Sequence, residues 1–434
     1  MIIADTSHIV LPLIVALSVF LMLTRPRGIR EVWWISGGAV LLIVLRLVPL
    51  AHAGRAIAKG SDVYLFLIGM MLLSELARQQ GVFDWIASIS VRGANGSCSR
   101  LFLLVYGIGT LVTILMSNDA TAVVLTPAIL TVVRKAKVSP LPYLFVCAFI
   151  ANAASFVLPI SNPANLVLFQ AEMPSLGQWL AAFGVPSVLS IFATFFVLRI
   201  VFREELGRKI DHEVEVVTLS GNGKLVLCGL AIMITALLTA SAMKKELGLP
   251  TCIAALLITV TVSIKAKSDP LKLAREISWA TLLLVAGLFI MVDAVESQGA
   301  LRITRQWLAW ASGLSQSAGA VVAGFTVGIA NNLVNNLPLG LIAGGTLHAA
   351  HTKGLIANAV LIGVDLGPNL SVTGSLATIL WLLALQNQSG ENAGSEKVEV
   401  SFWSFLKVGA IAMPVALLAA LGGALLMTIL INQR

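Results

Sequence analysis

The sequence predicts an all-α polytopic membrane protein, with about ten transmembrane helices and two re-entrant hairpins in two inverted repeats, and with broken helices at the midplane. Three observations lead to this fold class: an apolar composition, apolar runs of membrane-spanning length along the chain, and internal repetition. Of the 434 residues, 58% are hydrophobic and only 12% are charged, whereas soluble globular proteins carry roughly 25% charged residues. A soluble core cannot use so much apolar surface.

Apolar runs of membrane-spanning length recur from one end of the chain to the other. A helix needs roughly 17 to 25 predominantly apolar residues to cross the hydrocarbon core. Two stretches, 101–134 and 316–350, are too long for one span and carry polar residues near their middle, so we expect a re-entrant hairpin at each. The remaining runs predict ten spans, at about 9–23, 32–50, 62–78, 141–172, 180–202, 224–243, 249–265, 279–297, 354–386 and 403–431.

The polar stretches between spans are short, so the chain is expected to form one membrane domain. Its first repeat would cover 1–202 and its second 224–434, joined by a cytoplasmic loop at 203–223. The run from Ile9 to Leu23 has no preceding basic segment and no small-residue cleavage site, which favours a first span over a cleaved signal peptide.

The basic residues indicate the orientation. The net charge of +8 could suggest nucleic acid, but the basic residues form short clusters between apolar spans, so no nucleic-acid surface is expected. Cytoplasmic loops accumulate Lys and Arg, and most of the 29 basic residues fall on one side when Arg25 is placed inside. This arrangement predicts that both termini are periplasmic, and reading each hairpin as two full spans would not change that. The cytoplasmic set would include Arg25, Arg27, Arg30, Arg78, Arg92, Arg100, Arg134, Lys135, Lys137, Arg203, Arg208, Lys209, Lys265, Lys267, Lys272 and Arg275.

Internal repetition supports two related halves. GMMLLSELARQQGVF from Gly69 resembles GLFIMVDAVESQGAL from Gly287, and the same offset carries Ser117-Asn118 onto Asn335-Asn336. A similar offset carries Asn152 onto Asp365 and NPANL onto SLATI. The third and eighth spans run in opposite directions in the predicted topology. Inverted repeats with discontinuous helices around a midplane site are the plan of many secondary transporters.

Four polar clusters interrupt the apolar sequence at repeat-related positions. They are MSNDATAVVLTP from Met116, LPISNPANLVLF from Leu158, NNLVNNLPLG from Asn331 and DLGPNLSVTGSLAT from Asp365. Pro and Gly end helices there, which frees backbone groups that need a partner in the membrane and brings partial charge to one point. Amides and hydroxyls around such breaks suit a small, neutral, polyhydroxylated solute. The predicted substrate-binding residues are Ser117, Asn118, Ser161, Asn162, Asn165, Asn335, Asn336, Thr373, Gly374, Ser375 and Thr378.

A purely structural interpretation competes with this one, because Asn, Ser and Thr often only join membrane helices by hydrogen bonds. The same choice applies to the two carboxylates in the clusters, Asp119 and Asp365. Burial favours the neutral form of a carboxyl group, so either could couple transport to protons. Alternatively, Asp119 only caps the second arm of the first hairpin, and Asp365 only bonds near its helix break.

Other chemistries find little support in the sequence. Glu75 and Asp293 are related by the repeat offset but lie toward span ends, where solvation at the interface explains them. His348 and His351 have the spacing of a surface pair, and the four cysteines have no C-x-x-C spacing, so no metal site is predicted. No nucleotide-binding G-x-x-x-x-G-K-[ST] loop and no nucleophile-base arrangement occur. We therefore expect no catalytic residues and no cofactor.

The clusters resemble those of the arsenite permeases of the ArsB type, in the ion-transporter superfamily. DLGPNLSVTGSLATILW from Asp365 is similar to that family's D-L-G-P-K-x-x-x-x-G-S-L-A-T-L-L-W segment, and NNLP from Asn335 to its N-N-x-P. SNDATAVVLTP from Ser117 is similar to N-D-G-A-A-x-x-L-T-P. The chain departs from the family at Asn369, where Lys is common, at DATA in 119–122, and at ISNPANL in 160–166.

The resemblance implies efflux of arsenite and antimonite, as neutral trihydroxides exchanged for protons, across the bacterial inner membrane. It also implies an optional soluble arsenite-stimulated ATPase at the cytoplasmic face, and it leaves a homodimer open. Two alternatives remain: a sodium/proton antiporter of the same superfamily, because a hard cation would use the same carboxylates, and a membrane subunit that mainly docks the ATPase through the 203–223 loop. The expected partners are arsenite or antimonite, protons and membrane lipid.

Overall fold

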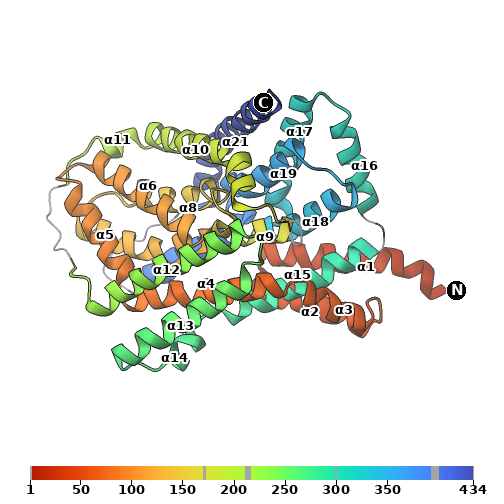
Figure 1. Cartoon of the computed structure of the whole chain (residues 1–434), viewed down its shortest axis with the longest axis horizontal. Helices are drawn as coiled ribbons and strands as arrows, with labels where there is room; N and C mark the ends of the chain where they lie inside the picture. Colours follow the sequence, from red (N-terminus) through yellow and green to blue (C-terminus); the bar gives the residue numbers. More distant parts are fainter. Residues whose placement is uncertain are drawn as a thin grey trace.

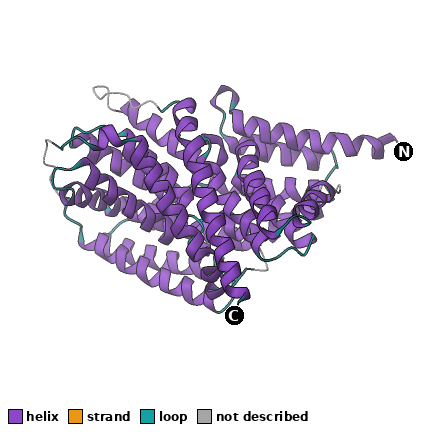
Figure 2. Cartoon of the chain, turned by 90° about the horizontal axis from the view of Figure 1, so that it is seen from above, coloured by secondary structure: helices purple, strands orange, loops and turns teal. Residues whose placement is uncertain are grey.

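The computed structural model describes residues 2–169, 173–210, 217–297, 299, 301–391 and 400–433. These residues form helices and connecting turns without a strand, apart from one isolated bridge between Ser97 and Lys209. Figure 2 shows the helices packed into one body from which the N-terminal helix projects. The all-α fold class predicted from the sequence is confirmed.

The helices follow the predicted apolar runs closely. In the first half they are α1 (Ile2–Thr24), α2 (Glu31–Val44), α3 (Leu50–Lys59), α4 (Ser61–Gln79), α5 (Val82–Gly93), α6 (Cys98–Leu115), α7 (Thr126–Lys135), α8 (Leu141–Ala153), α9 (Pro163–Phe169), α10 (Leu176–Val201) and α11 (Arg203–Leu206). In the second half they are α12 (Gly221–Ala242), α13 (Gly248–Ala266), α14 (Pro270–Glu276), α15 (Trp279–Ser297), α16 (Leu301–Ser312), α17 (Gln316–Val334), α18 (Asn336–Ala349), α19 (Leu355–Leu366), α20 (Leu376–Glu391) and α21 (Phe402–Asn432).

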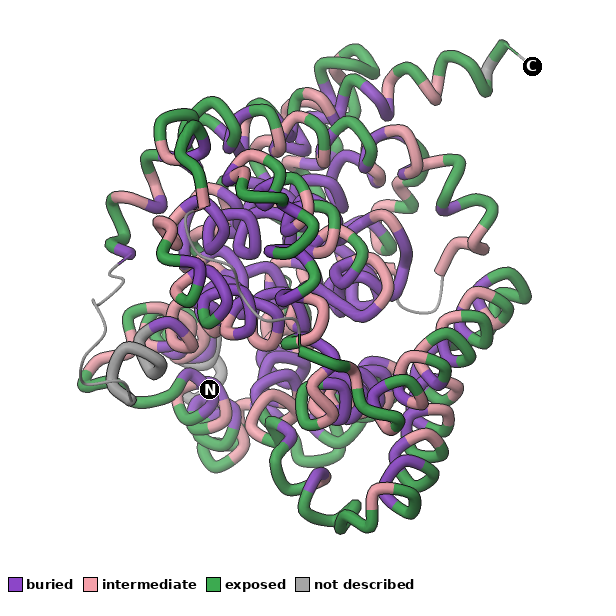
Figure 3. The backbone as a smooth tube through the Cα atoms, turned by 90° about the vertical axis from the view of Figure 1, so that its left-hand side faces the viewer, coloured by how far each residue is buried: buried purple, intermediate pink, exposed green. Residues whose placement is uncertain are grey.

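Two layers of helices make up the molecule. The peripheral layer contains α1 to α4 and α12 to α15, which lie along the lower part of Figure 1, with α4 against α13 and α2 against α15. The central layer contains α5 to α11 and α16 to α21, where α10 packs on α21 and α17 on α19. Figure 3 shows buried residues concentrated inside each of the two groups. Both layers mix helices from the two halves of the chain, so neither half folds as a separate bundle.

The centre of the central layer is unusually apolar and closed. Every residue of α8 from Pro142 to Ala153 is buried, as expected for a helix that is hydrophobic on all sides. Phe145 and Phe149 pack on Phe405 of α21, with ring centroids 5.8 and 4.9 Å apart, and Phe145 also meets the edge of Trp381. This aromatic cluster holds α8 in place beside the polar breaks.

Seven of the described helices are long and apolar enough to cross a membrane: α6, α10, α12, α13, α15, α17 and α21. The pair α3 and α4, bent by 53°, adds an eighth. Shorter apolar helices cover the other predicted spans. They are the part of α1 from Ile9 to Thr24, α2, which ends at Val44, and the helices into which 141–172 and 354–386 are broken. The chain is a multi-pass membrane protein.

All four polar clusters coincide with interruptions in helices. The first separates α6 from a π-helical turn, η2 (Ala120–Leu125), that leads into α7, and the third separates α17 from α18. The second and fourth contain short 3₁₀ turns, η3 (Pro159–Ser161), η5 (Gly367–Asn369) and η6 (Val372–Gly374). The first arms of the two predicted hairpins, α6 and α17, are each long enough to span a membrane by themselves.

A glycine contact that sequence reasoning did not single out joins α17 to α19. Gly324 and Gly328 on α17 face Gly363 on α19 and Gly367 at the start of η5, and each pair has G-x-x-x-G spacing. A methyl group at Gly363 would lie 2.5 Å from the carbonyl oxygen of Gly324, and one at Gly367 would overlap that of Gly328. Small residues at this spacing let two membrane helices approach closely, which fixes the break after α19 against α17.

Candidate functional site

The helix breaks at the second and fourth polar clusters, one in each half of the chain, cross at the centre of the molecule. Asn162, just before α9, donates a hydrogen bond from Nδ2 to Oδ1 of Asp365, at the end of α19. Asn152 at the end of α8 donates from Nδ2 to Oδ1 of Asn369, over 3.0 Å, and Nδ2 of Asn369 donates back to the carbonyl of Phe149. The predicted second and fourth clusters are therefore brought together.

Asp365 lies at the most enclosed point of this crossing. Its side chain is fully buried, and its second oxygen, Oδ2, has no hydrogen-bond partner among the described residues. An incompletely satisfied buried carboxyl is costly, which in membrane proteins marks a functional position more often than a structural one. The bond from Asn162 supports the structural interpretation of Asp365, and its role in proton coupling stays a prediction.

Other predicted residues of the second and fourth clusters bond mainly to the backbone. Ser161 donates to the carbonyl of Ile114, and Asn165 donates to that of Ser155, over 3.0 and 2.9 Å. Oγ of Ser375 accepts from the amide of Thr378, over 3.4 Å. Oγ1 of Thr378 accepts in turn from Nδ2 of Asn152. These contacts satisfy backbone groups that the helix breaks leave open.

The third cluster is tied to the fourth in the same way. Nδ2 of Asn335 donates to the carbonyl of Thr373, over 3.2 Å, and Oγ1 of Thr373 donates to that of Asn332, over 2.9 Å. Asn335 has a φ of 79° and a ψ of 153°, a backbone conformation that few residues other than Gly adopt. Gly374 is required here, because a Cβ would come within 2.6 Å of the backbone Cα of Pro368.

The first cluster behaves differently, since two of its residues face open space. Asp119 makes no capping hydrogen bond, so the alternative that it caps the second hairpin arm is wrong. Ser117 takes that role by accepting from the amide of Ala120, over 3.2 Å. Asn118 is buried, as is its repeat mate Asn336, and the Oδ1 atom of each has no hydrogen-bond partner among the described residues.

We name the space beside Ser117 and Asp119 the inner cavity. It has a volume of about 170 Å³ and lies between the peripheral layer and the first two breaks. A water molecule occupies about 30 Å³ in the liquid, so a small hydroxylated solute fits. Its lining residues are Phe66, Leu67, Met70, Met71, Ser74, Glu75, Ser117, Asp119, Ala120, Val123, Val124, Pro163, Glu276, Ile277, Ser278, Thr281, Leu376 and Leu380.

Three carboxylates and four hydroxyl side chains make up the polar part of the described inner cavity lining. Glu75 and Glu276 join Asp119 in its wall, and no Lys or Arg is among its described lining residues. Arg78 forms an ion pair with Glu75 and a longer one, of 3.4 Å, with Glu276. Arg78 contacts two residues of the cavity wall, and Arg275 precedes Glu276 in the chain. Because Arg78 and Arg275 belong to the predicted cytoplasmic set, this cavity lies toward the predicted cytoplasmic end.

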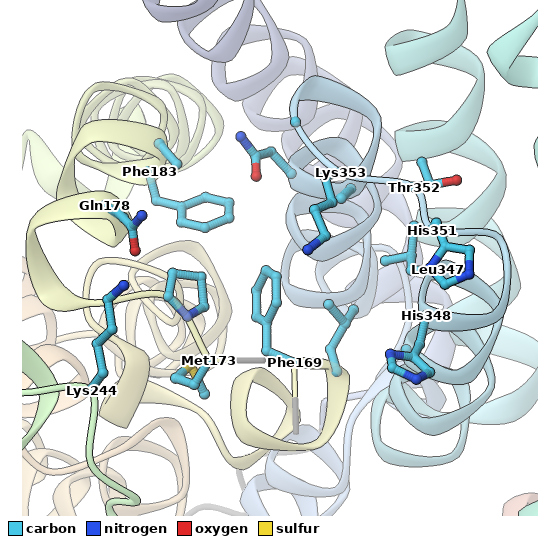
Figure 4. A pocket seen from close by; sticks show the side chains of 17 residues that line it. Phe169, Met173, Gln178, Phe183, Lys244, Leu347, His348, His351, Thr352 and Lys353 are labelled. Carbon is cyan, nitrogen blue, oxygen red and sulfur yellow. The ribbon is translucent and has the colours of Figure 1, made fainter. Parts of the chain in front are cut away.

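Two further pockets lie at the opposite end of the molecule. The outer pocket, of about 630 Å³, lies between the end of α9, the start of α10, Lys244 after α12, and the turn from α18 to α19 (Figure 4). A neighbouring pocket of about 260 Å³ is lined by Lys59, Asp293 and Glu296, and shares His348 with the outer pocket. Both histidines, His348 and His351, are exposed, as predicted.

Several residues of the site were not predicted from the sequence. Glu75 was explained by solvation at the interface, yet its side chain lines the inner cavity with Ser74. Asn152 was noted only as a repeat mate, and Asn331 and Asn332, which bond to backbone carbonyls at 363–367, were not selected. The described residues contain no group of three or more His, Cys, Asp or Glu side chains that could hold a metal ion.

Comparison with known proteins identifies the family. The model of the CitMHS family, described as citrate transporter, matches residues 13–364. The chain belongs to this family. Transporters of the CitMHS family are membrane proteins, so the prediction of a multi-pass transporter rather than an enzyme is confirmed.

Individual relatives and one solved structure extend the match over most of the chain. This CitMHS chain is 27% identical to the arsenical pump membrane protein of Escherichia coli strain K12 over 397 residues, which cover 87% of the chain and 90% of the relative. It is 25% identical to an uncharacterized transporter of Synechocystis, covering 88% and 90%. The Alcanivorax borkumensis YdaH transporter, described as having an unusual topology, has the same fold, with a TM-score of 0.55, 15% identity, and coverage of 88% and 87%.

Proposed function

We propose that this chain exports arsenite and antimonite, as neutral trihydroxides, across the inner membrane in exchange for protons. The inner cavity would take the solute from the cytoplasm, with the hydroxyl of Ser117 as a hydrogen-bonding group. Asp119 would carry the proton, because it is the cluster carboxylate that lines the cavity. The crossing between Asn162 and Asp365 would hold the two breaks in register.

The charge of the inner cavity is the observation that supports this choice within the CitMHS family. Arg78 pairs with Glu75 and Glu276 from outside the described lining, whereas Asp119 has no ion pair among the described residues, so the charge of Asp119 would repel a citrate-like anion. A neutral trihydroxide meets no such repulsion and can exchange hydrogen bonds with carboxylate and hydroxyl groups. The relatives named as arsenical pump membrane proteins, at 25 to 27% identity, point in the same direction.

The substitution Asp119→Asn tests the proposal directly. It keeps the shape of the side chain but removes the exchangeable proton, so we expect it to abolish arsenite resistance in an arsenic-sensitive host without reducing the amount of protein in the membrane. Arsenite uptake by everted vesicles is the second measurement. Glu246→Gln, a carboxylate outside the cavity lining, is the matched control. Undiminished resistance with Asp119→Asn would remove Asp119 from the mechanism.

A second candidate, a sodium/proton antiporter, is favoured by the same three carboxylates. A hard cation prefers oxygen ligands and is attracted to an acidic cavity. Everted vesicles distinguish the two functions: proton movement that depends on sodium, without arsenite uptake, would support the antiporter. Arsenite uptake driven by a proton gradient in sodium-free buffer would support the exporter.

A further inference from the structure

The neighbouring pocket and the inner cavity are lined by residues at equivalent positions of the two predicted repeats. Gly69 and Gly287, which begin the related segments, are 218 positions apart. The same offset carries five residues of the inner cavity wall onto five described residues of the neighbouring pocket wall. The pairs are Met71 with Phe289, Ser74 with Val292, Glu75 with Asp293, Val123 with Leu341, and Ile277 with Lys59. The predicted repeat therefore relates the two pockets to each other.

The two pockets lie at opposite ends of α4 and α15. The inner cavity uses Glu75, near the end of α4, and Thr281, near the start of α15. The neighbouring pocket uses Val292 and Asp293, near the end of α15, together with Lys59, two residues before α4 begins. The two helices exchange roles between the pockets, as an inverted repeat requires.

Each pocket also lies against the second arm of one predicted hairpin. In the inner cavity, Val123 comes from η2, which leads from the first break into α7. In the neighbouring pocket, Leu341 and Gly344 come from α18, which follows the third break. Both pockets therefore lie between the peripheral layer and a segment that follows a helix break, and their described walls have no residue in common.

An acidic residue with a basic partner occupies the same place in both pockets. Glu75 pairs with Arg78 on its own helix, whereas Asp293 accepts a hydrogen bond from Nζ of Lys59 on α3, over 2.6 Å. The side chains of Lys59 and Asp293 are 57% and 23% exposed. An ion pair with that much access to solvent contributes little to stability, so α3 and α15 can separate at this point without a large cost in free energy.

We propose that the neighbouring pocket is the exit of the transport path, where the solute leaves at the predicted periplasmic end. This inference rests on the proposed export of a neutral trihydroxide. The volumes, about 260 Å³ here and about 170 Å³ in the inner cavity, both accommodate a small hydroxylated solute. Two separate pockets at repeat-related positions are what a transporter of this plan needs, because its site opens to one side of the membrane at a time.

The exit is tested by attaching a charged group inside each pocket. Val292→Cys and Ser74→Cys place a thiol at repeat-related positions, and Ser297→Cys places one at the end of α15, on an exposed residue outside the described pocket walls. All three are made in full-length protein that carries Cys228→Ser, which removes the exposed native thiol. A charged, membrane-impermeant thiol reagent is applied to spheroplasts, which present the periplasmic face, or to everted vesicles, which present the cytoplasmic face. Mass spectrometry measures the labelled fraction.

We expect Val292→Cys and Ser297→Cys to be labelled in spheroplasts only, and Ser74→Cys in everted vesicles only. Everted vesicles prepared from the labelled spheroplasts should take up arsenite with Ser297→Cys but not with Val292→Cys, because only in Val292→Cys does the attached group fill the pocket. The proposal is overturned if Val292→Cys is not labelled from the periplasmic face, or if its labelled form takes up arsenite as fast as labelled Ser297→Cys. Melting temperatures of the unlabelled variants confirm that each is folded.

Failure of the proposed function would be recognised separately. Unlabelled protein that carries only Cys228→Ser would then take up no arsenite, yet the side from which Val292→Cys is labelled would still decide whether the pocket opens to the periplasm. Sodium-dependent proton movement would then replace arsenite uptake as the measure of the block.

Discussion

Polar side chains at the helix breaks perform three different tasks in this chain. Most of them, such as Asn165 and Asn335, donate to backbone carbonyls that a broken helix leaves without partners. Ser117 and Asp119 instead face the inner cavity. The bond from Asn162 to Asp365 belongs to a third kind, since it joins side chains of the two halves in a site without water access.

Removal of the Asn162 amide should cost stability. Asn162→Ala leaves the buried carboxyl group of Asp365 without its donor, so we expect a loss of about 1–3 kcal/mol, the penalty for an unsatisfied buried group. The readout is the melting temperature of the purified protein. Asn358→Ala, which removes an amide from a partly exposed position, should leave that temperature nearly unchanged. Equal melting of both variants would contradict a structural role for the bond.

The sequence predicted the positions of the cluster residues, but not which of them bond to the backbone and which line a cavity. Polar residues stand out within long apolar runs, so Ser117, Asp119 and Asp365 could all be predicted as site residues from the sequence. Which of them faces a cavity depends on helices far away in the chain: Glu75 and Ser74 come from α4, and Glu276 from α14. Periodicity describes one helix at a time, so it cannot place α4 beside the first break.

At the scale of elements, the contact between α17 and α19 sets the position of the fourth cluster. Carbonyl groups of Gly324 and Gly328 lie directly against Gly363 and Gly367. Asn331 of α17 then donates hydrogen bonds from Nδ2 to the carbonyls of Gly363 and Val364 on α19. Close packing and polar contacts thus act together, as is usual for membrane helices.

A methyl group in this contact should separate the two helices. We expect Gly363→Ala to lower the melting temperature and to reduce transport, because the added Cβ would overlap backbone atoms that cannot rotate away. Gly184→Ala is the control, since a Cβ there meets no atom within 4 Å and Ala favours the helix over Gly. A Gly363→Ala protein as stable as the Gly184→Ala protein would show that the contact is looser than described.

At the scale of the whole molecule, the two layers are the feature that the sequence least revealed. The predicted spans agree with the helices, yet the assignment of α12 and α13 to the peripheral layer and of α16 to α21 to the central one follows from packing between distant segments. The inverted repeats remain a prediction, supported by the pairing of breaks. The division into 1–202, 203–223 and 224–434 also remains a prediction, and residues 211–216 of the loop lie outside the described part.

The predicted orientation is testable with fusions. We expect alkaline phosphatase, which is active only in the periplasm, to be active when attached at the C-terminus and inactive when inserted after Lys209 in the connecting loop. A fluorescent protein that matures only in the cytoplasm should give the reverse result. The opposite pattern in both reporters would place the inner cavity at the periplasmic end and would reverse the proposed direction of transport.

The bond from Asn162 to Asp365 also constrains how the protein is made. The two residues are 203 positions apart, so at about 5–20 residues per second a ribosome needs ~10–40 s to deliver the second partner after the first. During that interval α8 and α9 are in the membrane without the segments that complete their breaks. The newly made first half therefore cannot form this bond until the second half has been synthesised.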